Sequence, residues 1–174
     1  MRHAFLIIAH NNWGQLKKLI QLLDAENHEI YIHIDKKSKD FMENEFVDIT
    51  KKSKVFIFQE YEVFWGGFSS VQVELFLFEK AYALQYDYYH LISGADLPLK
   101  SNKDIDTFFE RNKEKNFILF DEDKLQNDPE ISRRAKYYHF LQNYRRRFSQ
   151  KWKNDFFTFL ERVSLVFQIL FRVN

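Results

Sequence analysis

The sequence predicts an α/β protein in which helices cover both faces of a mostly parallel β-sheet. The first observation is His3–Ala9, HAFLIIA, a continuous apolar run with the length of a strand that is buried on both faces. The second is that further strand-like runs alternate with segments whose apolar residues recur at helical spacing. Such alternation makes neighbouring strands parallel, because each helix carries the chain back across the sheet.

The first half of the chain contains three predicted strands. The helix after the first strand is expected to begin at Asn11 or Asn12, either of which can cap it. Its apolar face consists of Leu16, Leu19, Ile20 and Leu23. The second strand is expected over Glu29–Ile34 and the third over Val55–Phe58, with a short helix or an irregular segment over 40–52.

The stretch Val63–Lys80, VFWGGFSSVQVELFLFEK, combines an aromatic run, the pair Gly66 and Gly67, and a long helix expected over about Ser69–Leu84. The serine pair at the start of the helix is the expected N-cap. The apolar residues of this helix include Val71, Val73, Leu75, Leu77, Phe78 and Ala81. A glycine turn before a helix N-terminus presents free N–H groups to phosphate or sugar oxygens. The alternative is that the glycines serve only the geometry of the turn.

The last predicted elements of the sheet domain follow this helix. Tyr88–Ile92 is expected to be a strand, and Ser101 or Asn102 is expected to cap a helix that runs to about Arg111. Asn116–Phe120 is expected to be one more strand. The sequence therefore predicts strands and helices in near-regular alternation, without an internal repeat.

The composition excludes several classes of protein. With 45% apolar and 18% aromatic residues among 174, the chain is not disordered in bulk. The absence of cysteine excludes disulfides and thiolate metal sites, and the formal charge of +1 gives no support to nucleic-acid binding. The N-terminal apolar run is too short for a signal peptide, and no stretch has the length of a membrane span.

The segment from Arg133 to Lys153 contains eight Lys or Arg residues, no Asp or Glu, and several interleaved aromatic residues. This pattern favours an anion, either a diphosphate or an anionic membrane surface, and the alternative is a solvated face. Residues 155–171 are then expected to form an apolar helix that Glu161, Arg162 and Gln168 interrupt. This helix can pack on a partner or lie on a membrane. We favour a third reading, a core helix whose packing partner lies beyond the sequence given.

Polar residues gather in loops at the carboxyl ends of the predicted strands, where open α/β sheets bind ligands. These loops are Ala9-His10-Asn11, Asp35-Lys36-Lys37-Ser38, Trp65-Gly66-Gly67 and Ser93-Gly94-Ala95-Asp96. Asp35 can accept a hydrogen bond from a ribose hydroxyl or a uracil N–H, and Lys36 or Lys37 can meet a phosphate. Trp65 can stack on a base or a sugar, and Asp96 can hold a sugar hydroxyl or a metal. Together these residues suggest a nucleotide-sugar site.

Each of these residues also has a structural interpretation. Asp35 and Asp96 can simply cap turns, and His10 can bond a neighbouring carbonyl. His33 and His90 lie inside strands, where a core histidine is expected. The chain has no HExxH, no P-loop, no GxGxxG and no Gly-x-Ser-x-Gly motif.

The same loops carry a family resemblance. The sequence resembles the core-2/I-branching β-N-acetylglucosaminyltransferases (glycosyltransferase family 14), which include the peptide O-xylosyltransferases. The resemblance covers about residues 3–140. The matching stretches are IIAHNN at 7–12, YIHIDKKS at 31–38, VFWGGFSSVQVEL at 63–75, YYHLISGADLPLKS at 88–101 and, more weakly, ISRRAKYYHF at 131–140.

The resemblance implies a GT-A-type Rossmann-like fold and an inverting transfer of N-acetylglucosamine or xylose from a UDP-sugar to a glycan or Ser hydroxyl. It also implies chemistry without a divalent metal or other cofactor, in which basic side chains neutralise the diphosphate. The loop Ser93–Asp96 agrees, since it has no paired carboxylate. The residues that the resemblance places at the UDP moiety are Ile8, Ala9, His10, Asp35, Lys36, Lys37 and Trp65. Gly66 and Gly67 join them as donor-binding candidates, and the candidates for substrate binding are Ser93, Asp96, Arg133 and Arg134.

One departure from the family concerns the catalytic base. In the family this base is a Glu of the C-terminal half, so we expect it beyond Asn174, and Glu161 is not assigned the role. We therefore expect residues 1–130 to form the nucleotide-sugar-binding domain and 131–174 to begin the acceptor and catalytic half. The alternative is a catalytically inactive module that binds a nucleotide-sugar or pairs with a partner, including a second copy, through helix 155–171.

The expected setting is a microbial cell. The absence of cysteine and of an N-terminal anchor fits a cytoplasmic bacterial protein better than a Golgi enzyme. A cell-surface polysaccharide or lipopolysaccharide is then the natural acceptor. The basic segment and the apolar helix would suit docking at the inner face of the membrane.

Overall fold

The structure is a computed structural model that describes residues 1–64, 66–118, 121, 127–129, 131, 136–144 and 148–171. The chain divides into two compact units. The first consists of Met1–Val63 and Ser69–Glu114, and the second of Phe64–Phe68 and Lys115–Asn174. The sheet lies entirely in the first unit.

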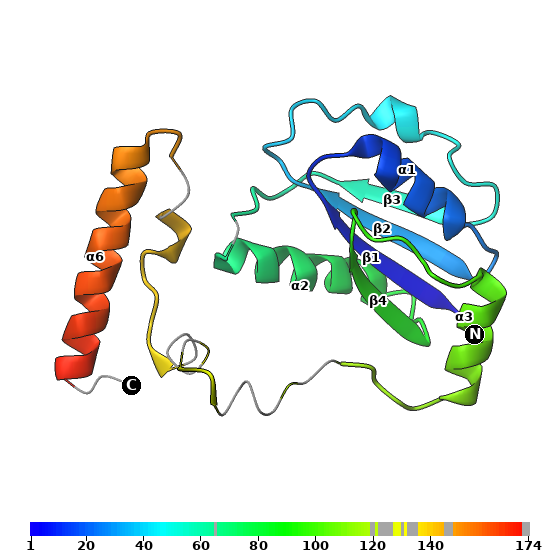
Figure 1. The fold of residues 1–174 in the computed structure, drawn as a ribbon. Coiled ribbons are helices and arrows are strands. Elements are labelled where there is room, and N and C mark those ends of the chain that lie inside the picture. Colours follow the sequence, from blue (N-terminus) through cyan, green and yellow to red (C-terminus); the bar gives the residue numbers. More distant parts are fainter. Residues whose placement is uncertain are drawn as a thin grey trace. The chain divides into compact units, whose positions relative to one another are not determined.

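The first unit is built on a parallel sheet, as the sequence predicts, and the sheet has four strands (Figure 1). Its strands are β1 (His3–Ala9), β2 (His28–Ile34), β3 (Lys54–Phe58) and β4 (Tyr88–Ser93). Their spatial order is β3-β2-β1-β4. The chain therefore adds β2 and β3 on one side of β1 and then returns to add β4 on the other side.

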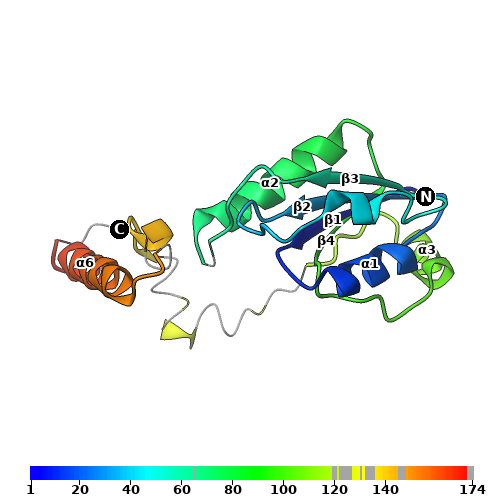
Figure 2. The same cartoon turned by 90° about the horizontal axis from the view of Figure 1, so that it is seen from above.

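This reversal puts the two crossover helices on opposite faces of the sheet (Figure 2), because right-handed crossovers in opposite directions cover opposite faces. Helix α1 (Trp13–Leu22) packs against one face, and α2 (Phe68–Tyr82) packs against the other. Residues of β1 alternate between them: Phe5 and Ile7 belong to the core under α1, and Ala4 and Leu6 to the core under α2.

The predicted helix faces are partly confirmed. The four apolar residues expected after β1 are all buried in the core under α1, namely Leu16, Leu19, Ile20 and Leu23. In α2 the buried stripe is Val73, Leu77 and Ala81, whereas Val71 and Leu75 are exposed. The sheet covers a single stripe of α2, so only residues four apart along the helix are buried.

The first residues of the helices correct one predicted N-cap and confirm two. Helix α2 begins at Phe68, so the serine pair lies inside its first turn and does not cap it. Asn12 is the N-cap of α1, but it adopts a left-handed φ of 55° and its side chain makes no capping hydrogen bond. Ser101 caps α3 (Asn102–Arg111), where its hydroxyl accepts a hydrogen bond from the backbone N–H of Asp104 at 3.2 Å.

The prediction for the segment 40–52 is confirmed, whereas the prediction of a strand after α3 is wrong for the described residues. The segment 40–52 contains one short 3₁₀ helix, η1 (Glu43–Phe46), as expected of a short helix or an irregular region. The strand predicted over Asn116–Phe120 is wrong for 116–118, which form no strand and pair with none. Ile118 is 82% exposed, so the apolar pattern there is not satisfied by a neighbouring strand. Residues 119 and 120 lie outside the described part of the chain.

The second unit contains η2 (Gln142–Tyr144) and α6 (Lys151–Leu170), the helix expected over 155–171. The polar residues Glu161 and Gln168 are the buried side chains of α6. The carboxylate of Glu161 accepts a hydrogen bond from the backbone N–H of Leu141 at 2.9 Å, and Gln168 bonds both the N–H and the carbonyl of Tyr138. These bonds offset the cost of burying the polar groups.

The apolar side chains of α6 are largely exposed. They include Trp152, Phe156, Phe159, Val163, Val166, Phe167, Ile169 and Leu170. Within the described residues no helix has the combination of length and hydropathy that crossing a bilayer requires.

Candidate functional site

The carboxyl ends of the central strands lie side by side. Ala9 at the end of β1 is paired with Ile34 at the end of β2, and Ile8 is paired with Ser93 at the end of β4. The loops that follow these strands therefore share one edge of the sheet, called here the carboxyl edge. The strand order reverses between β1 and β4, which is where open α/β sheets form ligand crevices.

Asp35 ties three segments of the carboxyl edge together. Its backbone N–H donates to the carbonyl of Ala9 at 2.9 Å. Its Oδ1 accepts the backbone N–H of Lys37 at 2.9 Å and that of Val63 at 3.2 Å. The residue is buried, so these hydrogen bonds to a charged acceptor are shielded from water. The loop after β2 is thereby fixed to the end of β1 and to the segment after β3.

The two lysines of this loop lie in different surroundings. Nζ of Lys37 lies 3.4 Å from Oδ2 of Asp35 and donates to the carbonyl of Val63. Lys36 is exposed, and its backbone N–H donates to the carbonyl of Tyr61 at 3.0 Å. Lys36 is therefore held by its backbone while its ammonium group faces solvent, as a contact to a phosphate requires.

A second set of bonds joins the same loops. Oγ of Ser38 donates to the carbonyl of His10 at 2.6 Å. The side-chain amide of Gln59 donates to the carbonyl of Asp35 at 3.3 Å and to that of Ser38 at 3.1 Å. The imidazole of His10 is exposed. Gln59 was not among the predicted site residues, because its only signal in the sequence is its place directly after a strand.

The loop after β4 is closed by its own side chains. Oδ2 of Asp96 accepts the backbone N–H of Ser93 at 2.8 Å, and Oγ of Ser93 accepts that of Ala95 at 3.2 Å. The N–H of Gly94 donates to the carbonyl of Ile8 at 2.9 Å. A Cβ at Gly94 would lie 2.6 Å from Cβ of Ala9, so only glycine allows this approach to β1.

These contacts confirm one of the two interpretations of Asp35 and Asp96 given above, namely that they cap turns. Both carboxylates accept backbone N–H groups of their own loops. Asp96 is exposed and Asp35 is buried. A ligand contact by either residue is a further role, which remains a prediction.

Burial lowers the pKa of His33, and the nearby Asp35 and Glu60 partly offset this effect. Its Nε2 accepts the backbone N–H of Tyr61 at 3.1 Å. The ring is therefore neutral, with its proton on Nδ1. His33 is fully buried, which confirms that it is a core histidine.

The remaining site predictions fall in the second unit or outside the described residues. Gly66 adopts a φ of +75°, as expected of a glycine turn, and its carbonyl accepts the side-chain amide of Gln142 at 2.9 Å. The N–H of Gly67 donates to the carbonyl of Phe64 at 2.9 Å. The predicted site residues outside the described part of the chain are Trp65, Arg133 and Arg134.

The fold and the carboxyl edge define an α/β protein with ordered loops at the point where its strand order reverses, a geometry typical of nucleotide-binding sheets. The sequence pattern of the family described as Core-2/I-Branching enzyme matches residues 3–159, and the chain belongs to this family. The match extends beyond the residues on which the resemblance was based and includes part of α6.

The chain is also similar to xylosyltransferases. It is 27% identical over 125 residues to "Xylosyltransferase 2" of Homo sapiens and 26% identical over 124 residues to that of Canis lupus familiaris, and each match covers 68% of this chain and 14% of the relative. It is 24% identical over 124 residues to "Xylosyltransferase 1" of Homo sapiens, covering 68% of this chain and 13% of the relative. The chain thus spans about one seventh of the length of these relatives.

Proposed function

We propose that this chain is the donor-binding part of a glycosyltransferase that uses a UDP-sugar and transfers N-acetylglucosamine or xylose to a glycan hydroxyl. The observation that carries the proposal is the set of loops fixed around Asp35 at the carboxyl edge, in a chain of the Core-2/I-branching family. This is the edge where a parallel sheet presents its loops to a nucleotide.

In the proposed donor site, different loops contact the diphosphate and the sugar of the donor. The loop after β2 supplies the exposed ammonium group of Lys36 for the diphosphate, and Asp35 holds that loop in place. The loop after β4 supplies the exposed carboxylate of Asp96 and the hydroxyl of Ser93 for hydroxyls of the sugar. Because hydrogen bonds to charged groups are worth about 1.5–3 kcal/mol each, a few such contacts suffice to orient the donor.

The proposed reaction is an in-line displacement that inverts the anomeric carbon. A carboxylate base removes the proton of the acceptor hydroxyl as its oxygen attacks that carbon, and the bond to UDP breaks. Fixed positive charge stabilises the departing diphosphate, so we propose that transfer proceeds without a divalent metal. In this proposal the chain's own residues bind and orient the donor.

We place the reaction in the synthesis of a cell-surface polysaccharide, with the protein in the cytoplasm and in contact with the inner face of the membrane. The absence of cysteine and the basic composition between Arg133 and Lys153 support this setting. Binding to anionic vesicles that weakens as salt is added would support the membrane contact.

Calorimetric titration with UDP, UDP-N-acetylglucosamine and UDP-xylose tests the donor site, first in EDTA and then with Mn²⁺. We expect binding in EDTA that the Lys36→Ala variant weakens by about 10- to 100-fold, the effect of losing one charged hydrogen bond. Lys39→Ala is the matched control, because Lys39 is an exposed lysine of the same region. No binding under either condition, or equal losses in both variants, would contradict the proposed site.

A further inference from the structure

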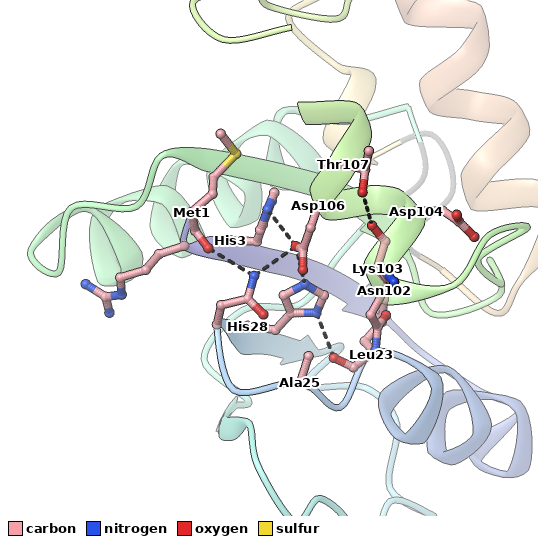
Figure 3. A network of polar contacts seen from close by, with 12 residues as sticks. Met1, His3, Leu23, Ala25, His28, Asn102, Lys103, Asp104, Asp106 and Thr107 are labelled. Carbon is pink, nitrogen blue, oxygen red and sulfur yellow. Dashed lines mark hydrogen bonds and ion pairs between the residues drawn. The ribbon is translucent and has the colours of Figure 1, made fainter. Parts of the chain in front are cut away.

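A second cluster of polar side chains lies at the amino ends of the strands, the edge opposite the candidate donor site. It consists of His3 at the start of β1, His28 at the start of β2 and Asp106 on α3 (Figure 3). His3 is 0% exposed and His28 is 1% exposed, whereas the side chain of Asp106 is 33% exposed. All three residues belong to the first unit.

The distances within the cluster suit a metal ion. Oδ1 of Asp106 lies 3.2 Å from Nε2 of His3 and 3.6 Å from Nε2 of His28, and all the ligand atoms lie within 4.8 Å of one another. Tetrahedral zinc with bonds of about 2.0–2.1 Å holds neighbouring ligand atoms about 3.4 Å apart. The distance from Oδ1 of Asp106 to Nε2 of His3 is slightly shorter than this value, and the distance to Nε2 of His28 is slightly longer.

The protons of His28 support the same reading. Its Nδ1 lies 2.8 Å from the carbonyl oxygen of Leu23, which can only accept, so Nδ1 carries a proton. Nε2 is therefore the ring nitrogen that can offer a lone pair to a metal ion, and it lies 3.6 Å from Oδ1 of Asp106. A cation between Nε2 of His28 and Oδ1 of Asp106 would be bound by both atoms.

The Nε2 atoms of both His3 and His28 are buried and make no hydrogen bond with any described residue. Leaving a buried polar group unpaired costs about 1–3 kcal/mol. The 3.2 Å contact between Nε2 of His3 and Asp106 does not have the direction of a hydrogen bond. A cation bound to both nitrogens would satisfy them together.

Each proposed ligand residue also makes a second polar contact that orients its side chain. His28 is oriented by the carbonyl of Leu23, and Nδ1 of His3 lies 2.9 Å from Nε2 of His90. Oδ1 of Asp106 accepts the side-chain amide of Asn27 at 2.8 Å. Histidines that bind metals almost always make such a bond with their other ring nitrogen, because it fixes the tautomer and the orientation of the ring.

We propose that His3, His28 and Asp106 bind a divalent transition metal of the zinc type, which fastens α3 to the starts of β1 and β2. Two imidazole nitrogens and one carboxylate oxygen are ligands that zinc accepts, and water can complete the coordination from the exposed side of Asp106. The site lies at the opposite edge from the candidate donor site, so its role is structural and independent of the proposed transfer reaction. The three ligands come from separate elements and form no local motif, and the expectation of no metal rested on the family resemblance.

Metal titration of the full chain, freed of any affinity tag and stripped with a chelator, tests this proposal. We expect one equivalent of Zn²⁺ to bind by calorimetry and to raise the Tm. One equivalent of Co²⁺ should give the visible absorption of a tetrahedral nitrogen- and oxygen-ligated ion. Asp106→Asn and His28→Gln should each weaken binding by more than about 100-fold, since loss of an outer-shell partner alone costs about 10- to 100-fold.

Two further variants keep the test decisive. His10→Gln removes an exposed histidine outside the cluster and should leave binding unchanged. Asn27→Ala keeps all three ligands and should weaken binding by about 10- to 100-fold. The proposal is overturned if the wild-type chain binds neither metal stoichiometrically. It is equally overturned if binding survives in Asp106→Asn and His28→Gln, or is lost in His10→Gln.

Discussion

Oδ1 of Asp35 accepts the backbone N–H groups of both Lys37 and Val63, at 2.9 and 3.2 Å. A single buried carboxylate thus joins the loop after β2 to the chain that leaves β3. The arrangement of the carboxyl edge depends on this residue whether or not it also touches a ligand.

Replacing Asp35 with alanine should therefore destabilise the protein. Two partly buried N–H groups would lose a buried charged acceptor, so we expect a loss of about 2–4 kcal/mol in the free energy of unfolding. Urea denaturation measures it as a lower midpoint with an unchanged m value. Asp96→Ala is the control, because Asp96 is exposed and should cost less than about 1 kcal/mol. Equal effects of the two variants would show that burial of Asp35 does not matter.

Gly94→Ala should also be destabilising, for a steric reason. The added Cβ would lie 2.6 Å from Cβ of Ala9, and relieving such an overlap costs about 1–3 kcal/mol. Gly14→Ala is the matched control, since a Cβ there meets nothing within 4 Å and Gly14 lies in α1. That variant should gain up to about 1 kcal/mol. A Gly94→Ala protein as stable as the wild type would contradict the close approach of this loop to β1.

Acid should destabilise the first unit through His33. Burial lowers its pKa in the folded state, whereas the unfolded chain takes up the proton near pH 6.5. The stabilisation from the neutral ring is therefore complete above about pH 6.5 and is lost as the pH falls toward the folded pKa, by at most about 1.4 kcal/mol per pH unit. The free energy of unfolding between pH 7 and pH 5, measured in EDTA, checks this. Burial also lowers the pKa of His3 and His90 in the same unit, so His33→Gln, which keeps an acceptor for Tyr61, should reduce the slope without abolishing it. An unchanged slope would argue against His33 as one of the causes.

In the second unit, Glu161 should act as a structural anchor. Its carboxylate accepts the N–H of Leu141 at 2.9 Å, and Nδ1 of His139 lies 3.0 Å from its other oxygen. Glu161→Ala should therefore speed amide hydrogen exchange at Leu141 by at least about 10-fold, which corresponds to about 1.4 kcal/mol of local stability. Arg162→Ala removes an exposed neighbour on α6 and should leave this exchange unchanged. If Glu161→Ala exchanges at the wild-type rate, the carboxylate does not order this segment.

The central strands and α1 were predictable because burial on both faces leaves a clear pattern. The strand His3–Ala9 was predicted to its end residues, and each apolar position expected after it is buried. The strand order was not predicted, because it depends on the side of β1 to which each crossover returns. The strand that was wrongly expected over residues 116–118 has the same cause: these residues favour a strand locally, but they have no neighbour in the sheet.

The candidate site was predictable only as a set of loops. Parallel strands bring the loops after Ala9, Ile34 and Ser93 to one edge, so their residues could be named from the sequence. The hydrogen bonds of Gln59 and the cluster of His3, His28 and Asp106 could not, since they join residues far apart in the chain. The histidine at position 3 was seen only as the start of a strand.

The central claim is that the carboxyl edge binds the UDP moiety of a sugar donor, and NMR tests it most directly. In EDTA, we expect addition of UDP to shift the amide signals of Lys36, Lys37, Gly94 and Ala95, while those of His3 and His28 at the opposite edge stay in place. Absence of shifts at saturating UDP, or shifts that gather at the opposite edge, would contradict the account.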